Sequence, residues 1–193
     1  MKPAHRQDKQ RVVEILTQAF EKDPQINWII NPTDAQRNRR LSLLMEYAFE
    51  EGMLNGSIYL SDNNRGVAIW LDPSKHNISL ALLYAKLRFA WSMGVRRIFK
   101  TLVMQKNVYK KHPQHKNYFY LWFLAVKPEA QGKGISSELL NPYIEKSFST
   151  QRPIYLETST IPNVKIYTHK GFQVFSEWKP KDKSQLTVWC LRR

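Results

Sequence analysis

The stretch that decides the fold is Tyr120-Leu-Trp-Phe-Leu-Ala-Val126, which continues directly into Lys127-Pro-Glu-Ala-Gln-Gly-Lys-Gly134. The first part is an apolar run typical of a buried strand, and the second contains two glycines and is typical of a turn. Apolar residues then recur at helical spacing up to about Phe148. A strand that ends in a glycine-containing turn opening a helix presents backbone N–H groups to a phosphate. This segment therefore predicts a phosphate-binding loop.

The length and composition predict one folded domain over residues 1–193. Hydrophobic residues make up 42% of the chain and aromatic residues 12%, whereas disordered chains are poor in both. Cys190 is the only cysteine, so no internal disulfide can form and a reducing, intracellular setting is expected. The N-terminus is polar, and no apolar run approaches the roughly 20 residues that a membrane-spanning helix needs. We therefore expect a cytoplasmic protein without a membrane span.

The chain carries a net charge of +14 and has an isoelectric point near 9.9. Such a positive field attracts phosphate groups, so nucleic acid, an anionic membrane surface and a polyanionic small cofactor are alternative partners. Basic residues cluster at 37–40, 86–88, 96–100 and 106–116, where a solvated surface is the simplest interpretation. Because no recognised nucleic-acid-binding motif accompanies the charge, we do not expect a nucleic acid partner.

Hydrophobic periodicity predicts an α/β protein of the mixed α+β class. Helices are expected over 8–20, 33–52, 134–148 and 162–170, and strands over 57–61, 66–71, 117–126, 153–157, 172–178 and 185–191. Thr33 and Asp34 are the expected caps of the second helix, residues 21–30 are expected to form a loop, and Pro142 is expected to kink its helix. This order predicts one mixed sheet of six to seven strands flanked by helices.

Residues 72–116 form a basic insertion between the second and third predicted strands. Their periodicity predicts two helices separated by Gly94. The residues expected to line one face of each helix are Leu80, Leu83, Tyr84, Leu87 and Trp91 in the first and Val95, Ile98, Phe99 and Leu102 in the second. A lid over a binding site is the simplest role, and association with a membrane surface through residues 78–108 is the alternative.

The glycine turn nearly matches the fingerprint of dinucleotide-binding proteins, with Glu157 in place of the ribose-binding acid. However, Ser137 stands where the third glycine belongs, and residues 127–131 separate the strand from the glycines. The segment also lies late in the chain, with one further strand–helix unit behind it, so half of a Rossmann fold is hard to assemble. These features argue against a dinucleotide site.

The same residues resemble a known family. Gln131-Gly-Lys-Gly134-Ile-Ser136, preceded by Leu124-Ala-Val-Lys-Pro128, resembles the pyrophosphate loop of the GNAT superfamily of N-acetyltransferases, (Arg/Gln)-x-x-Gly-x-(Gly/Ala). Ser136 departs from that pattern, although serine is small enough to keep the backbone accessible. Leu156-Glu-Thr-Ser-Thr-Ile-Pro-Asn163 and Ile166-Tyr-Thr-His-Lys-Gly-Phe172 are similar to the second motif, in the form found in the puromycin N-acetyltransferase branch. Residues 19–28 resemble that branch's substrate-side loop.

The resemblance implies acetyl-CoA as the acyl donor. The residues it assigns to the pyrophosphate are Gln131, Gly132, Lys133, Gly134, Ile135, Ser136 and Ser137, and those it assigns to the pantetheine arm are Leu124, Ala125, Val126 and Asn163. Asn163 could instead be a local helix-start residue. No metal is expected, because His112 and His115 lack a third ligand and a basic loop is the simpler interpretation.

The resemblance also implies direct transfer to an amine. Glu157 would accept the proton of the amine or bind its ammonium group, and Tyr167 would protonate the departing thiolate, although Tyr167 could also simply pack in the core. The expected acceptor-binding residues are Phe20, Asp23, Trp28 and Trp122. We expect a small-molecule primary amine, with a protein or peptide amine as the alternative. The sequence leaves the oligomeric state open.

Overall fold

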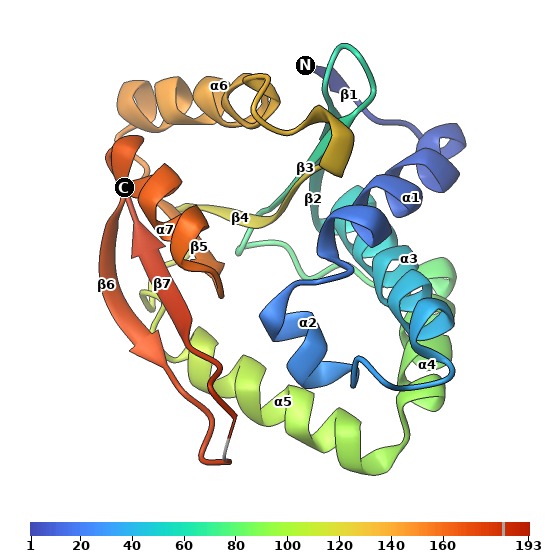
Figure 1. Ribbon diagram of the computed structural model, residues 1–193. Helices are drawn as coiled ribbons and strands as arrows, with labels where there is room; N and C mark the ends of the chain where they lie inside the picture. The colour runs from blue at the N-terminus through green and yellow to red at the C-terminus, as the bar shows by residue number, and fades with distance from the viewer. Residues whose placement is uncertain (183) are drawn as a thin grey trace.

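One mixed sheet forms the centre of the structure, a computed structural model that describes residues 1–182 and 184–193. Its strand order is β1-β2-β3-β4-β5-β7-β6 (Figure 1). The strands are β1 Lys2–Pro3, β2 Gly56–Leu60, β3 Gly66–Leu71, β4 Phe119–Val126, β5 Ile154–Thr158, β6 Gln173–Trp178 and β7 Val188–Arg192. The predicted mixed sheet of six to seven strands is confirmed. The strand that the sequence did not predict is the two-residue β1 at the edge.

Helices pack on both faces of the sheet. They are α1 Lys9–Phe20, α2 Pro24–Ile29, α3 Arg37–Asn55, α4 Leu80–Met93, α5 Val95–Tyr109, α6 Ile135–Thr150 and α7 Ile161–His169, with short 3₁₀ turns at Arg6–Asp8 and Pro128–Ala130. Because side chains alternate along a strand, β3 serves both cores. Val67 and Ile69 pack with α1 and α3, whereas Ala68 and Trp70 pack with α6. Figure 1 shows α6 on the side of the sheet opposite α1 and α3.

Two local predictions in the first third of the chain are wrong. Residues 21–30 are not simply a loop, because Asp23 caps the short helix α2 by accepting a hydrogen bond from the Ile26 amide at 3.0 Å. Thr33 and Asp34 do not cap α3, which begins later, at Arg37. The Asp34 carboxylate instead forms ion pairs with Arg40 and Arg97, the second of these in α5.

The strands β4 and β5 diverge at the centre of the sheet. They pair in parallel only over 119–121 and 154–156. Beyond Leu121, β4 continues to Val126 and stays paired with β3 on its other side. The edge of β4 that faces away from β3 is therefore open over its last residues.

The basic insertion lies between β3 and β4 as the helices α4 and α5, which run at a large angle to each other (Figure 1). Gly94 separates them with a φ of 74°, a conformation that favours glycine. The buried face of α4 consists of Leu82, Ala85, Phe89 and Met93. This is a different face from the one that the sequence pattern indicated. Within the described ranges, no helix is long and apolar enough to cross a bilayer.

Candidate active site

Two adjoining cavities lie where β4 and β5 diverge. The smaller, of about 140 Å³, is enclosed by the strand ends and by helices α2 to α5. The larger, of about 570 Å³, lies beside the glycine turn at the start of α6. Five side chains line both cavities: Phe20, Asp23, Leu124, Asn163 and Tyr167. The cavities therefore meet at residues that the sequence assigned to donor, acceptor and catalysis.

The glycine turn is built to receive an anion. Gly132 and Gly134 have φ values of 75° and 77°, and no atom lies within 4 Å of where a β-carbon would stand on either. Gly134 is the N-cap of α6, so the first N–H groups of that helix lack intrahelical acceptors and lie at the positive end of its dipole. Of the predicted loop residues, the ones that line the larger cavity are Gln131, Gly132, Gly134, Ile135, Ser136 and Ser137.

Two predicted cofactor residues lie outside this lining. The Lys133 ammonium group is 3.2 Å from the carbonyl oxygen of Glu129, and Ala125 is buried in the core that β4 shares with α1 and α3. The alternation along β4 explains the second case, because Leu124 and Val126 point into the cavity on the opposite side. The open edge of β4 also offers backbone groups to an extended arm, as an added strand would use them.

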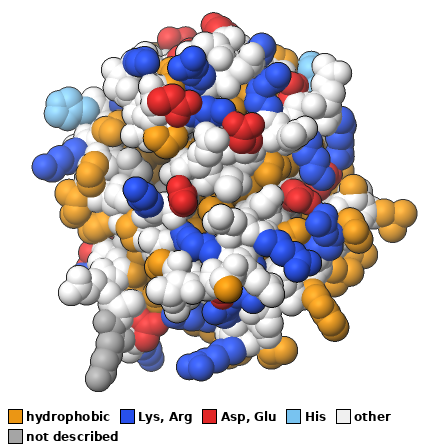
Figure 2. Space-filling model, turned by 45° about the vertical axis from the view of Figure 1, so that its right-hand side comes forward, with side chains coloured by type: hydrophobic (Ala, Val, Ile, Leu, Met, Phe, Trp, Pro, Cys, Tyr) orange, Lys and Arg blue, Asp and Glu red, His pale blue; other side chains and the backbone are white. Residues whose placement is uncertain are grey.

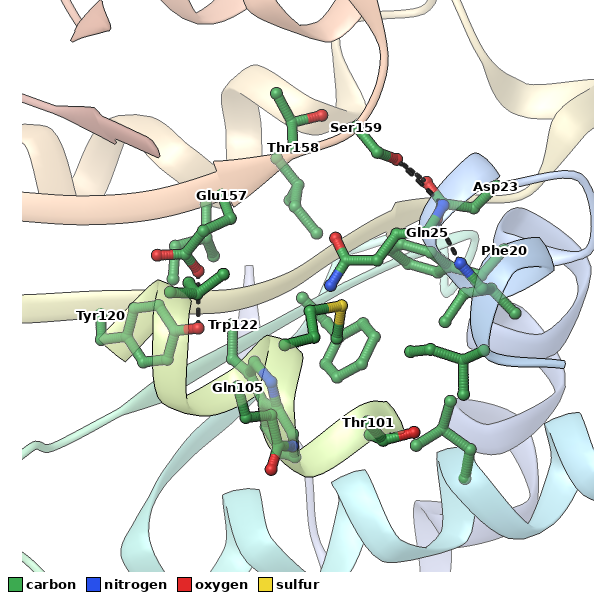
Figure 3. Close-up of a pocket in the computed structure, with 18 of the residues that line it drawn as sticks. Phe20, Asp23, Gln25, Thr101, Gln105, Tyr120, Trp122, Glu157, Thr158 and Ser159 are labelled. Carbon is green, nitrogen blue, oxygen red and sulfur yellow. Dashed lines mark hydrogen bonds between the residues drawn. The ribbon is translucent and has the colours of Figure 1, made fainter. Parts of the chain in front are cut away.

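A buried carboxylate stands at one end of the smaller cavity. The Tyr120 hydroxyl donates a hydrogen bond to Glu157 Oε2 at 2.7 Å, and His112 Nε2 is hydrogen-bonded to Glu157 Oε1. His112 Nδ1 lies 3.3 Å from the Tyr118 hydroxyl. Figure 3 shows Tyr120 and Glu157 joined at the end of the cavity opposite Asp23. The carboxylate is thus held in one orientation by two side chains.

His112 lies in the loop that follows α5, where the sequence predicted a basic loop, and its side chain makes a contact that was not predicted. Its side chain is buried and contacts Glu157, which is distant in sequence, so no local pattern could have indicated the contact. Because a buried polar group needs a hydrogen-bond partner, the His112 imidazole pairs with the Glu157 carboxylate. His112 and Glu157 do not form a metal site with a third group: within the described part of the chain, no three His, Cys, Asp or Glu side chains cluster.

Tyr167 lies at the junction of the two cavities. It projects from α7, and its ring packs edge-on against Phe172 with centroids 5.6 Å apart. Burial raises the pKa of the Tyr167 phenol well above its usual range, so the group carries its proton at neutral pH. Nearby, Asn163 Nδ2 donates to Thr158 Oγ1 at 3.2 Å, while the cap of α7 is Thr160.

A second carboxylate, Asp23, faces the junction from the start of α2. The Ser159 hydroxyl donates to Asp23 Oδ2 at 3.0 Å, which ties α2 to the end of β5 (Figure 3). Burial raises the pKa of the Asp23 carboxyl, although these hydrogen bonds act in the opposite direction. Trp122, which the sequence predicted to bind the acceptor, lines the smaller cavity.

Trp28 does not line the smaller cavity. Its indole N–H donates to Asp182 Oδ2 at 2.9 Å, its ring packs edge-on against Trp178, and the Lys100 ammonium group lies 3.9 Å from the ring centroid. The structure therefore places Trp28 between α2, α5 and the segment that follows β6, away from the smaller cavity.

Comparisons with known proteins agree with this geometry. The acetyltransferase (GNAT) family model matches residues 12–172. An uncharacterized N-acetyltransferase of Schizosaccharomyces pombe is 26% identical over 179 residues, which cover 86% of this chain and 70% of that protein.

Solved structures show the same fold. A Corynebacterium glutamicum structure described as histone acetyltransferase HPA2 and related acetyltransferase has a TM-score of 0.71 at 23% identity, covering 100% of this chain and 96% of that one. Arylalkylamine N-acetyltransferase 2 of Aedes aegypti has a TM-score of 0.60 at 16% identity, with the same coverage of 100% and 96%. The chain belongs to the acetyltransferase (GNAT) family and is an acyltransferase enzyme.

Proposed function

We propose that this enzyme transfers the acetyl group of acetyl-CoA to a primary amine of a small molecule. The observation that carries the proposal is the meeting of two chemically different cavities at Tyr167 and Leu124. One cavity offers helix N–H groups to an anion, and the other offers a carboxylate in an apolar surrounding. The motif likeness to the puromycin N-acetyltransferase branch supports the same assignment.

The donor fits the larger cavity. Gln131, Gly132 and the first residues of α6 would hold the pyrophosphate through their N–H groups, while the open edge of β4 would pair with the pantetheine arm. A backbone N–H near Leu124 would then polarise the thioester carbonyl, and a fixed donor of this kind is often the largest catalytic contribution. Asn163 borders both cavities and would contact the arm close to the sulfur.

The acceptor fits the smaller cavity. Its walls are mostly aromatic and aliphatic, and the residues that give this character are Phe20, Ile26, Ile29, Leu44, Tyr47, Phe89, Met104, Val108, Trp122 and Phe123. A volume of about 140 Å³ suits a compact amine with an apolar body better than a protein side chain with its backbone. The fold likeness to an arylalkylamine N-acetyltransferase is compatible with an acceptor of this kind.

The transfer requires three proton movements. Glu157 takes one proton of the ammonium group, directly or through water, and the free amine then attacks the thioester carbon. The N–C bond forms, the C–S bond breaks, and Tyr167 gives its proton to the departing thiolate. The Tyr167 phenolate then takes the extra proton of the new amide nitrogen, which restores the phenol. Tyr120 and His112 keep the Glu157 carboxylate oriented toward the cavity. Asp23 is the second candidate for the base, because it borders both cavities and burial raises its pKa.

The proposal is tested by measuring thiol release from acetyl-CoA across a panel of amines. The panel should contain arylalkyl and aliphatic primary amines, matched N-methylated analogues, and lysine-containing peptides. We expect turnover with the small primary amines and a product mass increased by one acetyl group. Faster turnover of the peptides than of the small amines would assign a protein amine as the acceptor. Thiol release without an acetylated product would contradict acetyl transfer to an amine.

A further inference from the structure

The helices α4 and α5 have an outer face that takes no part in the site. Their inner faces contribute Phe89, Met104 and Val108 to the acceptor cavity. The outer face carries large apolar side chains in contact with solvent, with Leu80 87%, Trp91 92% and Val95 89% exposed. The other members of this outer face are Ile78, Leu83, Tyr84, Leu87, Phe99 and Leu102, all of them exposed. Exposed apolar patches of this extent mark interaction surfaces.

The same segment is strongly basic. No Asp or Glu occurs between Asp72 and Glu129, whereas residues 73–116 contain ten Lys and Arg. Arg88 and Arg97 are paired with acids of α3 and of the loop before it. Within the described part of the chain, the exposed Lys86 and Arg96 belong to none of the ion pairs. Figure 2 shows hydrophobic side chains projecting next to Lys and Arg on the right-hand side of the molecule.

We propose that this outer face docks the enzyme on an anionic phospholipid membrane. Trp91, Val95 and Phe99 would enter the boundary between headgroups and acyl chains, and Lys86 and Arg96 would meet the lipid phosphates. Apolar insertion and attraction to anionic lipids are the two components of binding by amphipathic helices. The docked protein would be peripheral, because the described helices include none that could span a bilayer.

The charge of this face argues against two other occupants. A second copy of the chain would use the same patch on both subunits, and such a symmetric contact would bring the unpaired cations of the two copies together. A nucleic acid would satisfy the cations and could stack on Trp91. It would leave aliphatic side chains such as Leu80, Leu87 and Val95 without a partner, because they gain nothing from a phosphate backbone.

Flotation of the protein with lipid vesicles tests the proposal. We expect the protein to float with vesicles that contain phosphatidylglycerol, to remain in solution with phosphatidylcholine vesicles, and to be released at high salt. The double variants Trp91→Ser/Phe99→Ser and Lys86→Glu/Arg96→Glu should each lower the bound fraction at least about tenfold. Matched controls are Phe148→Ser and Lys165→Glu, which change exposed residues of the same kinds on α6 and α7 and should float as wild type does.

Three outcomes would overturn the proposal: no flotation of the wild-type protein with anionic vesicles, equal flotation of the outer-face variants, or equal loss in the controls. A dimer in sedimentation velocity that Trp91→Ser/Phe99→Ser converts to a monomer would assign the face to a second copy. Retention of RNA or DNA that survives this double variant would show only that the cations bind phosphate. Acetyl-CoA turnover in detergent-free buffer, unchanged in all four variants, keeps any failure of docking separate from failure of the proposed reaction.

Discussion

The imidazole of His112 is hydrogen-bonded to the carboxylate of Glu157 at one end of the smaller cavity. His112 follows α5 and Glu157 is the second-last residue of β5, so the contact joins the basic insertion to the centre of the sheet. A carboxylate fixed in this way presents its free lone pairs to the cavity without rotating. The insertion therefore contributes to the proposed chemistry as well as to the walls of the acceptor cavity.

Replacement of Glu157 by glutamine should lower kcat about 100-fold or more if this carboxylate is the base. The deficit should be largest at low pH and shrink toward pH 9, because an alkyl ammonium with a pKa of roughly 10 increasingly arrives as free amine. A pH–rate profile of wild type and Glu157→Gln checks this. A deficit that stays constant with pH would assign Glu157 to amine binding. As a control, Tyr120→Phe should lower kcat less than Glu157→Gln does, because the carboxylate remains.

Replacement of Tyr167 by phenylalanine should slow the chemical step by about 100-fold while the dissociation constant of acetyl-CoA stays within twofold. The pKa of this phenol is raised by burial, so wild type should show no loss of the acid form up to the alkaline end of the assay. Single-turnover kinetics and calorimetric titration give the two quantities. Wild-type rates in Tyr167→Phe, measured where chemistry limits turnover, would remove the general-acid role.

Gly134 tests the phosphate turn. Alanine at this position should cost about 1 kcal/mol of unfolding free energy, because its φ of 77° strains any residue with a β-carbon, and it should raise the KM for acetyl-CoA. Gly94 is the control, with a φ of 74°, open space around it, and a position between α4 and α5. Its ψ of 158° differs from the 0° of Gly134, so the two losses of stability need not be equal. Gly94→Ala should lose stability but keep the KM of wild type. A normal KM in Gly134→Ala would weaken the assignment of the turn to the pyrophosphate.

Asp23 should make stability depend on pH. Its folded pKa lies above its unfolded value, so the native state holds more protons just above pH 4 and stability falls as the pH rises through the folded pKa. Asparagine still caps α2 but cannot ionise, so Asp23→Asn should flatten this fall. Alanine also removes the cap and should cost about 1 kcal/mol more. Urea unfolding from pH 4 to pH 8 compares the three proteins, and identical pH slopes would contradict the assignment.

Cys190 should be silent in the reaction. It is fully buried on β7 beside its register partner Glu157 on β5. Burial, with the nearby carboxylate, raises the pKa of its thiol to about 12. A thiol of this kind is a poor nucleophile. Cys190→Ala should therefore keep wild-type turnover, in agreement with direct transfer. Intact-protein mass spectrometry that shows an acetylated Cys190 during turnover would contradict it.

The sequence predicted the fold well where the pattern of a segment fits one kind of element. The apolar run of β4, the glycine turn and the stripe of α6 each allow one arrangement, and all three were found. Helix α4 was different because apolar residues surround it. Leu80, Leu83 and Leu87 recur at helical spacing, and so do Leu82, Ala85 and Phe89, so periodicity could not decide which set faces the core. In the structure, the second set packs against the core.

The site was predictable only where a contiguous motif carries it. Tyr167, Asn163 and Leu124 come from such motifs and meet at one junction. His112 does not, because its partner is brought to it by the fold. Asp34 shows the same limit. A local rule predicted it as a helix cap, but its carboxylate forms an ion pair with Arg97 of α5. Contacts between segments that are distant in the sequence follow from the fold and cannot be read from a local pattern.

The divergence of β4 from β5 after Leu121 means that the chain leaves the middle of its own sheet unfinished. The arm of acetyl-CoA would pair with the open edge of β4 as an additional strand, so binding would add hydrogen bonds to the sheet. By mass action, the protein would gain resistance to unfolding in proportion to the logarithm of the acetyl-CoA concentration above its dissociation constant. Hydrogen exchange of the 122–126 amides would then follow the metabolic supply of acetyl groups, and the lifetime of the enzyme would be tied to the abundance of its own donor.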